Sequence, residues 1–81
     1  MSDALQDRVR RICSQIFGIA AETIDEDTSP DTVLNWDSLK HMNLVLALEE
    51  EFGVQFTDTQ TVEMMNVGLI LSALRECGIK D

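Results

Sequence analysis

The strongest constraint on the fold is that apolar residues recur at helical spacing in separate segments of an 81-residue chain. In the first segment the intervals are four, three and four residues, through Leu5, Val9, Ile12 and Ile16. Such spacing places side chains on one face of an α-helix. No stretch of convincing length alternates apolar and polar residues as a half-buried strand does. The sequence therefore predicts an all-α fold.

Glycine and capping residues divide this pattern into four expected helices. The first covers residues 3–17 and ends at Gly18, and the second covers residues 38–52 and stops before Gly53. A short third helix is expected over residues 58–65, with Thr57 or Asp58 as its cap, and a fourth begins after the N-cap Asn66 and ends at Gly78. This order predicts a small four-helix bundle with a long loop between its first two helices.

At this length we expect a single domain over residues 1–81, because a second core usually needs a longer chain. A domain this small has little room for a deep enzyme cleft beside its core. The residues expected to share that core are Val9, Ile12, Ile16, Val45, Leu48, Phe52, Val67, Ile70 and Leu74.

Residues 18–36 form a long segment without a clear period, and loops of this length are often functional. Its apolar residues are expected to pin it onto the helices: Ile24, Val33, Leu34 and Trp36. The acidic run that begins at Asp25 looks like the start of a calcium loop. However, position six is Pro30 rather than Gly, and position twelve is Trp36 rather than Glu. We expect a solvated acidic loop.

The two cysteines, Cys13 and Cys77, form no CxxC pair, and the chain has one histidine. They are expected to be reduced, partly buried thiols, and no metal site is predicted.

The net charge of the chain limits the classes of partner that it can bind. Fifteen acidic and six basic residues give a net charge of -9, which argues against nucleic acid and favours partners with basic surfaces. No apolar run reaches the ~18 residues typical of a membrane span. The opening MSDALQDRVRR lacks the apolar core of a signal peptide. We expect a cytoplasmic monomer.

The second expected helix has apolar residues on two faces when it is projected at about 100° per residue. The first face holds Leu44, Val45, Leu48 and Phe52, and the second holds Leu39, Met42 and Leu46, with Glu49 beside it. One core cannot easily bury both faces. Either the loop or the third helix covers the second face, or this face is a docking surface for a partner.

Ser38 lies between these two faces at the start of the helix. A nucleophilic serine needs a base, but His41 is the single histidine and no GxSxG elbow is present. We therefore expect a non-catalytic protein, with His41 at the rim of the helix. Asp37 can cap the helix as well as Ser38 can. Ser38 is then exposed in the first turn, where free amides and the helix dipole favour an anion such as a phosphodiester.

The motif DSL (Asp37–Leu39), followed by LVLALEEEFGVQF (Leu44–Phe56), resembles the acyl carrier protein family. The resemblance extends over nearly the whole chain through the four-helix layout. It implies that a phosphopantetheinyl transferase attaches 4′-phosphopantetheine from coenzyme A to Ser38. It further implies that Asp37 accompanies this serine in the motif, that acyl groups are held as thioesters, and that the helix from Ser38 is the recognition helix.

The resemblance also implies acyl-loading and acyl-transferring enzymes of fatty-acid, polyketide or related biosynthesis as partners. Their expected contacts are Leu39, Lys40, Met42, Leu46 and Glu49. Asn35-Trp36 stand where the family commonly has a glycine, and Lys40, His41 and Asn43 stand in an often acidic stretch. These departures favour a specialised carrier over a housekeeping one. An aminoacyl or peptidyl carrier that uses the same serine and an unmodified helical interaction module remain as alternatives.

Overall fold

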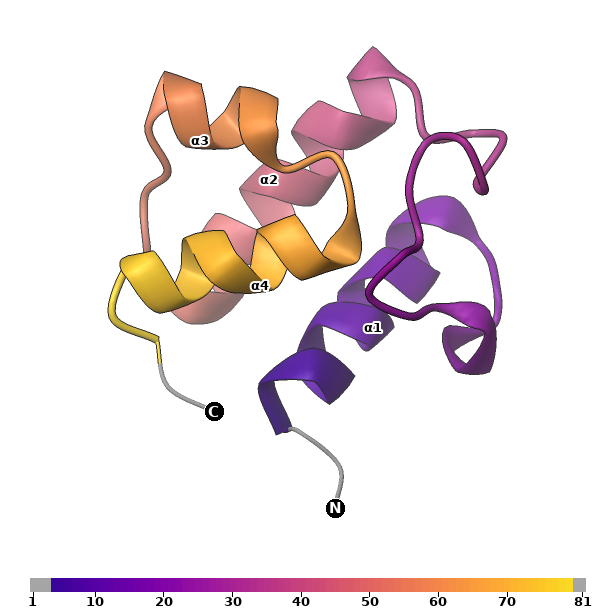
Figure 1. Cartoon of the computed structure of the whole chain (residues 1–81), viewed down its shortest axis with the longest axis horizontal. Coiled ribbons are helices and arrows are strands. Elements are labelled where there is room, and N and C mark those ends of the chain that lie inside the picture. Colours follow the sequence, from indigo (N-terminus) through magenta and orange to yellow (C-terminus); the bar gives the residue numbers. More distant parts are fainter. Residues whose placement is uncertain (1–3, 80–81) are drawn as a thin grey trace.

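The computed structural model describes residues 4–79. Within these residues, all regular secondary structure is helical (Figure 1). The elements are α1 (Ala4–Phe17), the short 3-10 helix η1 (Ala21–Thr23), α2 (Ser38–Phe52), α3 (Asp58–Glu63) and α4 (Val67–Glu76). The predicted all-α bundle is confirmed. Within residues 4–79, no helix combines the length and apolar character that crossing a membrane requires.

The predicted helix ends agree closely with the structure. Gly18 and Gly53 follow α1 and α2 with positive φ angles of 68° and 64°, which glycine adopts without strain. Thr57, rather than Asp58, caps α3 in a reciprocal capping box with Gln60. Asn66 caps α4, as expected, by accepting a hydrogen bond from a backbone N–H.

Two boundaries differ from the expectation. The residue Asp3, where α1 was expected to begin, lies outside the described residues. The helix α3 ends at Glu63 rather than Met65, because Met64 leaves the helical conformation and buries its side chain in the core. A helix of six residues with two threonines and no buried side chain has little to extend it further.

The core lies where α1 packs against α2 and α4 (Figure 1). Two residues expected in this core, Ile16 and Phe52, are only half-buried at its edge. Phe52 instead packs under the guanidinium of Arg8, which lies 4.3 Å from the ring centre. The fully or nearly fully buried core residues include Leu5, Val9, Cys13, Phe17, Ile24, Trp36, Leu44, Leu48, Met64, Val67, Ile70, Leu71 and Leu74.

The long loop is held onto the helices by part of its expected apolar set. Ile24, Val33 and Trp36 are buried, but Leu34 is 100% exposed, so the prediction for Leu34 was wrong. A turn in which the Trp36 N–H donates to the Val33 carbonyl directs both of these side chains inward. Leu34, which lies between them in the turn, consequently points to solvent.

The same loop also supports the start of α4. The first-turn N–H groups of Val67 and Gly68 donate to the loop carbonyls of Thr28 and Glu26, at 3.1 and 3.0 Å. These amides have no partner inside their own helix, so the loop satisfies them. Residues 26–28 are therefore fixed to α4.

Candidate functional site

The first turn of α2 separates the roles of two neighbouring residues. The Asp37 carboxylate accepts a hydrogen bond from the Lys40 N–H at 2.9 Å and is the N-cap of α2. Ser38 is therefore the first helical residue; it is exposed, and its hydroxyl makes no hydrogen bond within residues 4–79. Because Asp37 satisfies the helix end, the Ser38 hydroxyl is available for chemistry.

The backbone around Ser38 is suited to a negatively charged group. Among the described residues, the N–H groups of Ser38 and Leu39 have no hydrogen-bond partner, because the cap serves Lys40 alone. Free amides at a helix N-terminus, together with the helix dipole, stabilise a phosphate. A phosphodiester on Ser38 therefore fits this end of α2.

Ser38 also lines an open groove of about 500 Å³ beside the N-terminal half of α2. One wall comes from α2 through His41 and Met42, and the other comes from α3 and the residues after it. Its full lining is Pro30, Trp36, Asp37, Ser38, His41, Met42, Thr61, Val62 and Met65.

His41 is tied down on both sides of its ring. The Trp36 indole N–H donates to His41 Nδ1 at 3.0 Å, and His41 Nε2 lies 2.7 Å from the Thr61 carbonyl oxygen. An indole can only donate and a carbonyl can only accept, so the imidazole is neutral with its proton on Nε2. With both nitrogens engaged, His41 has no free nitrogen to act as a base on Ser38. The expected non-catalytic position of His41 agrees with this geometry.

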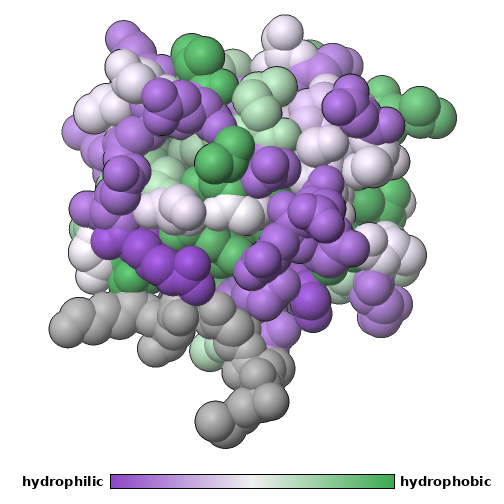
Figure 2. Space-filling view, in the orientation of Figure 1, coloured by the Kyte–Doolittle hydropathy of each residue, from purple (hydrophilic) through white to green (hydrophobic). Residues whose placement is uncertain are grey.

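The second apolar face of α2 lies open to solvent. Leu39, Met42 and Leu46 are 71, 48 and 54% exposed, so neither the loop nor α3 covers them. On the opposite wall of the groove, Val62 and Met65 are also exposed. Figure 2 shows hydrophobic residues (green) reaching the surface among hydrophilic ones on one face of the molecule.

Glu49 and Lys40, the two charged residues expected to contact partners, differ in whether their side chains are engaged within the protein. One oxygen of the Glu49 carboxylate accepts the Phe56 N–H at 2.9 Å and helps to hold the chain after α2. Lys40 is half-buried, and its backbone rather than its side chain is engaged by the Asp37 cap.

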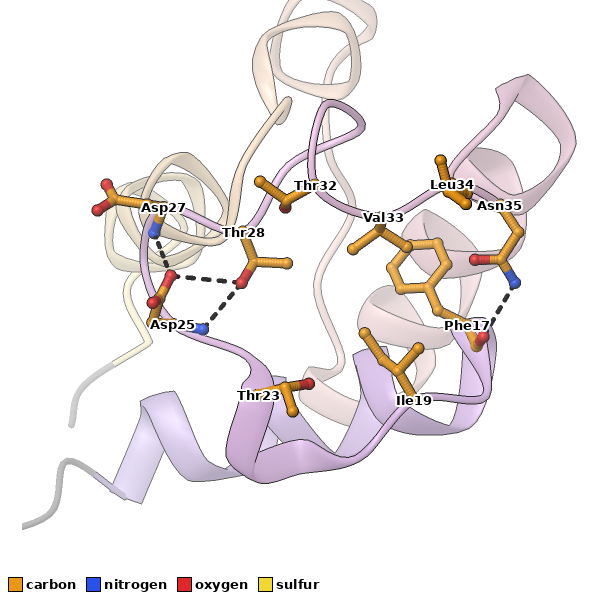
Figure 3. Close-up of a pocket in the computed structure, with 10 residues that line it drawn as sticks. All are labelled: Phe17, Ile19, Thr23, Asp25, Asp27, Thr28, Thr32, Val33, Leu34 and Asn35. Atoms are coloured by element: carbon orange, nitrogen blue, oxygen red, sulfur yellow. Dashed lines mark hydrogen bonds between the residues drawn. The ribbon is translucent and has the colours of Figure 1, made fainter.

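A second hollow, of about 620 Å³, lies between the end of α1 and the acidic loop, and Ser38 does not line it (Figure 3). Its polar groups are largely paired with one another. The Asp25 carboxylate accepts the Asp27 N–H at 2.9 Å, and Asn35 donates to the Phe17 carbonyl at 2.9 Å. Within residues 4–79, no three His, Cys, Asp or Glu side chains are placed to hold a metal ion.

The two thiols differ in accessibility, and a labelling experiment tests this. Burial raises the pKa of the Cys13 thiol to about 12, whereas Cys77 is half-buried near the chain end. We expect N-ethylmaleimide near neutral pH to modify Cys77 in the folded protein and Cys13 only after unfolding, because the thiolate is the nucleophile. Peptide mapping reads out the sites, and Cys77→Ser should abolish native labelling. Native labelling of Cys13 would contradict this assignment.

Sequence reasoning found the serine, its cap and the exposed face, but it missed part of the groove. Val62 and Met65 were not anticipated as wall residues, and nothing in the sequence joined His41 to Thr61, 20 residues away. The single histidine, five residues after the single tryptophan, was the available signal for the pair of Trp36 and His41.

Comparison with known proteins agrees with this site. Residues 7–74 match the family described as phosphopantetheine attachment site. An acyl carrier protein of Sinorhizobium fredii (strain NBRC 101917 / NGR234) is 40% identical over 68 residues, which are 84% of this chain and 86% of the relative. The acyl carrier protein AcpP of Rhizobium meliloti (strain 1021) shows the same identity and coverage.

The family match over residues 7–74 includes the acidic loop and the start of α2, where the structure has an exposed serine, free amides and an open groove. The prosthetic group of such proteins is 4′-phosphopantetheine, and the residues present fit it. This chain therefore belongs to the acyl carrier protein family.

Proposed function

We propose that Ser38 is the attachment site of 4′-phosphopantetheine and that the protein presents acyl intermediates to the enzymes of a specialised biosynthetic pathway. The observation that carries this proposal is the exposed Ser38 hydroxyl in the first turn of α2, left free because Asp37 is the cap. In the loading step the hydroxyl loses its proton and its oxygen bonds to the phosphorus next to the pantetheine. The pyrophosphate bond of coenzyme A breaks, and adenosine 3′,5′-bisphosphate leaves.

The residues around Ser38 would anchor and orient the arm. The amides of Ser38 and Leu39 favour the phosphodiester, and the groove gives the arm a surface on which to lie. When bound, the group supplies a thiol that holds acyl groups as thioesters. The chain contributes position and charge; the visiting enzymes perform the catalysis.

The partners would dock on the exposed face of α2. Leu39, Met42 and Leu46 supply apolar contact, Lys40 lies beside them, and Glu49 marks the edge of the surface. A net charge of -9 steers enzymes with basic surfaces, such as the transferase and acyl-loading and acyl-transferring enzymes, toward a monomeric carrier. Lys40 and His41 next to the serine favour partners of a specialised pathway over those of housekeeping fatty-acid synthesis.

Intact-mass spectrometry tests the attachment. The protein is incubated with coenzyme A and a promiscuous phosphopantetheinyl transferase, and a single mass gain of one phosphopantetheine is expected. Peptide mapping should place the whole gain on the peptide that contains Ser38. No mass gain, or a gain on another residue, would contradict the proposal.

A further inference from the structure

Three residues from three segments form a hydrogen-bonded bridge beside Ser38, which we call the bridge: Trp36, His41 and Thr61. The indole N–H of Trp36 donates to His41, and His41 donates to the Thr61 carbonyl, at 3.0 and 2.7 Å. The Trp36 ring is itself fixed against Phe17 at the end of α1, with ring centres 4.8 Å apart. The bridge therefore connects the end of α1, the start of α2 and the middle of α3.

All three residues of the bridge line the groove that Ser38 lines. His41 lies on the α2 side and Thr61 on the α3 side, so their hydrogen bond closes the groove between the two helices at that point. The exposed side chains of Met42, Val62 and Met65 form the outer, apolar part of the same groove.

Apart from the bridge, α3 is held mainly through the segments that flank it: Phe56, just before the helix, is buried, and its N–H donates to the Glu49 carboxylate of α2 at 2.9 Å. No residue of Asp58–Glu63 is buried, and the buried anchor Met64 comes only after the helix has ended. The hydrogen bond from Gln60 to Glu76 is long, at 3.4 Å, and exposed. Separation of α3 from α2 must therefore break the hydrogen bond between His41 and Thr61.

We propose that the bridge determines cargo specificity: it keeps α2 and α3 closed, so that a long acyl group stays in the outer groove and gains no burial between the helices. This inference rests on the proposed attachment at Ser38. A hydrocarbon that entered between α2 and α3 would leave the Thr61 carbonyl and the Trp36 N–H without partners. An alkyl chain cannot replace those hydrogen bonds, and unpaired buried polar groups are unfavourable.

The same reasoning predicts how variants of His41 behave. Leucine in place of His41 leaves both partner groups unpaired even before an acyl chain arrives, so chain entry no longer has to break them. The substitution His41→Gln retains one acceptor and one donor and should preserve the closed state. His41→Ala removes the same two hydrogen bonds with a smaller side chain; it serves as a second variant should His41→Leu not fold.

The test compares a short and a long acyl group on the same protein. Wild type and the variants are loaded from butanoyl-coenzyme A and dodecanoyl-coenzyme A with the transferase, and hydroxylamine cleavage of each thioester is timed by intact mass. In wild type and His41→Gln the two thioesters should be cleaved at similar rates. In His41→Leu the dodecanoyl thioester should be cleaved at least about tenfold more slowly than the butanoyl thioester, because insertion no longer strands the Thr61 carbonyl and the Trp36 N–H, and even one such group accounts for about a factor of ten.

Much slower cleavage of the long thioester than of the short one in wild type would overturn the proposal. Equal cleavage of the two thioesters in whichever of His41→Leu and His41→Ala folds would overturn it as well. Hydrogen exchange of residues 58–64 in the unloaded protein provides a separate readout: His41→Leu should speed exchange there, and His41→Gln should not. Failure of wild type to load would refute the attachment at Ser38. The exchange measurement would still decide whether the bridge holds α3, and equal exchange in all variants would refute the bridge.

Discussion

Replacement of Ser38 by alanine is expected to abolish loading with phosphopantetheine while leaving the melting temperature almost unchanged. The attacking oxygen is removed, so no transferase can modify the position. Stability should be preserved because Ser38 is exposed, its hydroxyl makes no hydrogen bond within residues 4–79, and Asp37 provides the cap. Alanine is also the best helix former for this position.

Two further variants separate attachment from helix capping. Ser72→Ala changes another exposed serine on a helix and should load as wild type does. Asp37→Ala removes the cap and should lower the free energy of unfolding by about 1 kcal/mol. Intact mass and thermal melting measured for all three variants distinguish the two roles. A mass gain retained in Ser38→Ala, or a large stability loss in that variant, would show that the assignment of these neighbours is wrong.

The second large effect is expected when one side chain on each apolar face of α2 is truncated to alanine and the free energies of unfolding are compared. Leu48 is fully buried, so Leu48→Ala should lower the free energy of unfolding by roughly 2–5 kcal/mol through lost burial and a cavity. That is a large fraction of the stability of a small domain. Met42 is 48% exposed, and Met42→Ala should cost less than about 0.5 kcal/mol.

The loading rates of the same two variants should rank in the opposite order, with Met42→Ala more affected than Leu48→Ala. Met42 lines the same groove as Ser38 and belongs to the proposed docking surface, so loss of its side chain should slow loading about five- to tenfold. Leu48→Ala should load normally under conditions in which it remains folded, because Leu48 does not reach the surface. Chemical denaturation and loading rates measured side by side check both expectations. A stability loss in Met42→Ala equal to that of Leu48→Ala would place the second face in the core.

Local patterns in the sequence determined the helices and the position of the proposed attachment site, Ser38. Helical spacing, glycines with positive φ and the caps Thr57 and Asn66 act over a few neighbouring residues, so they can be read without the fold. The same holds for Asp37 and Ser38, since the choice between cap and first helical residue depends on one turn of backbone.

Tertiary packing decided which apolar residues are buried and what surrounds the serine. Leu34 and Phe52 are as hydrophobic as their buried neighbours, but one lies within a surface turn and the other lies beneath Arg8 at the edge of the core. The contact between His41 and Thr61 joins residues 20 positions apart. Helical periodicity reports which side of a helix a residue occupies, but the neighbours that cover that side are set by how the helices meet. The groove and its bridge therefore emerge only when α3 is placed against α2.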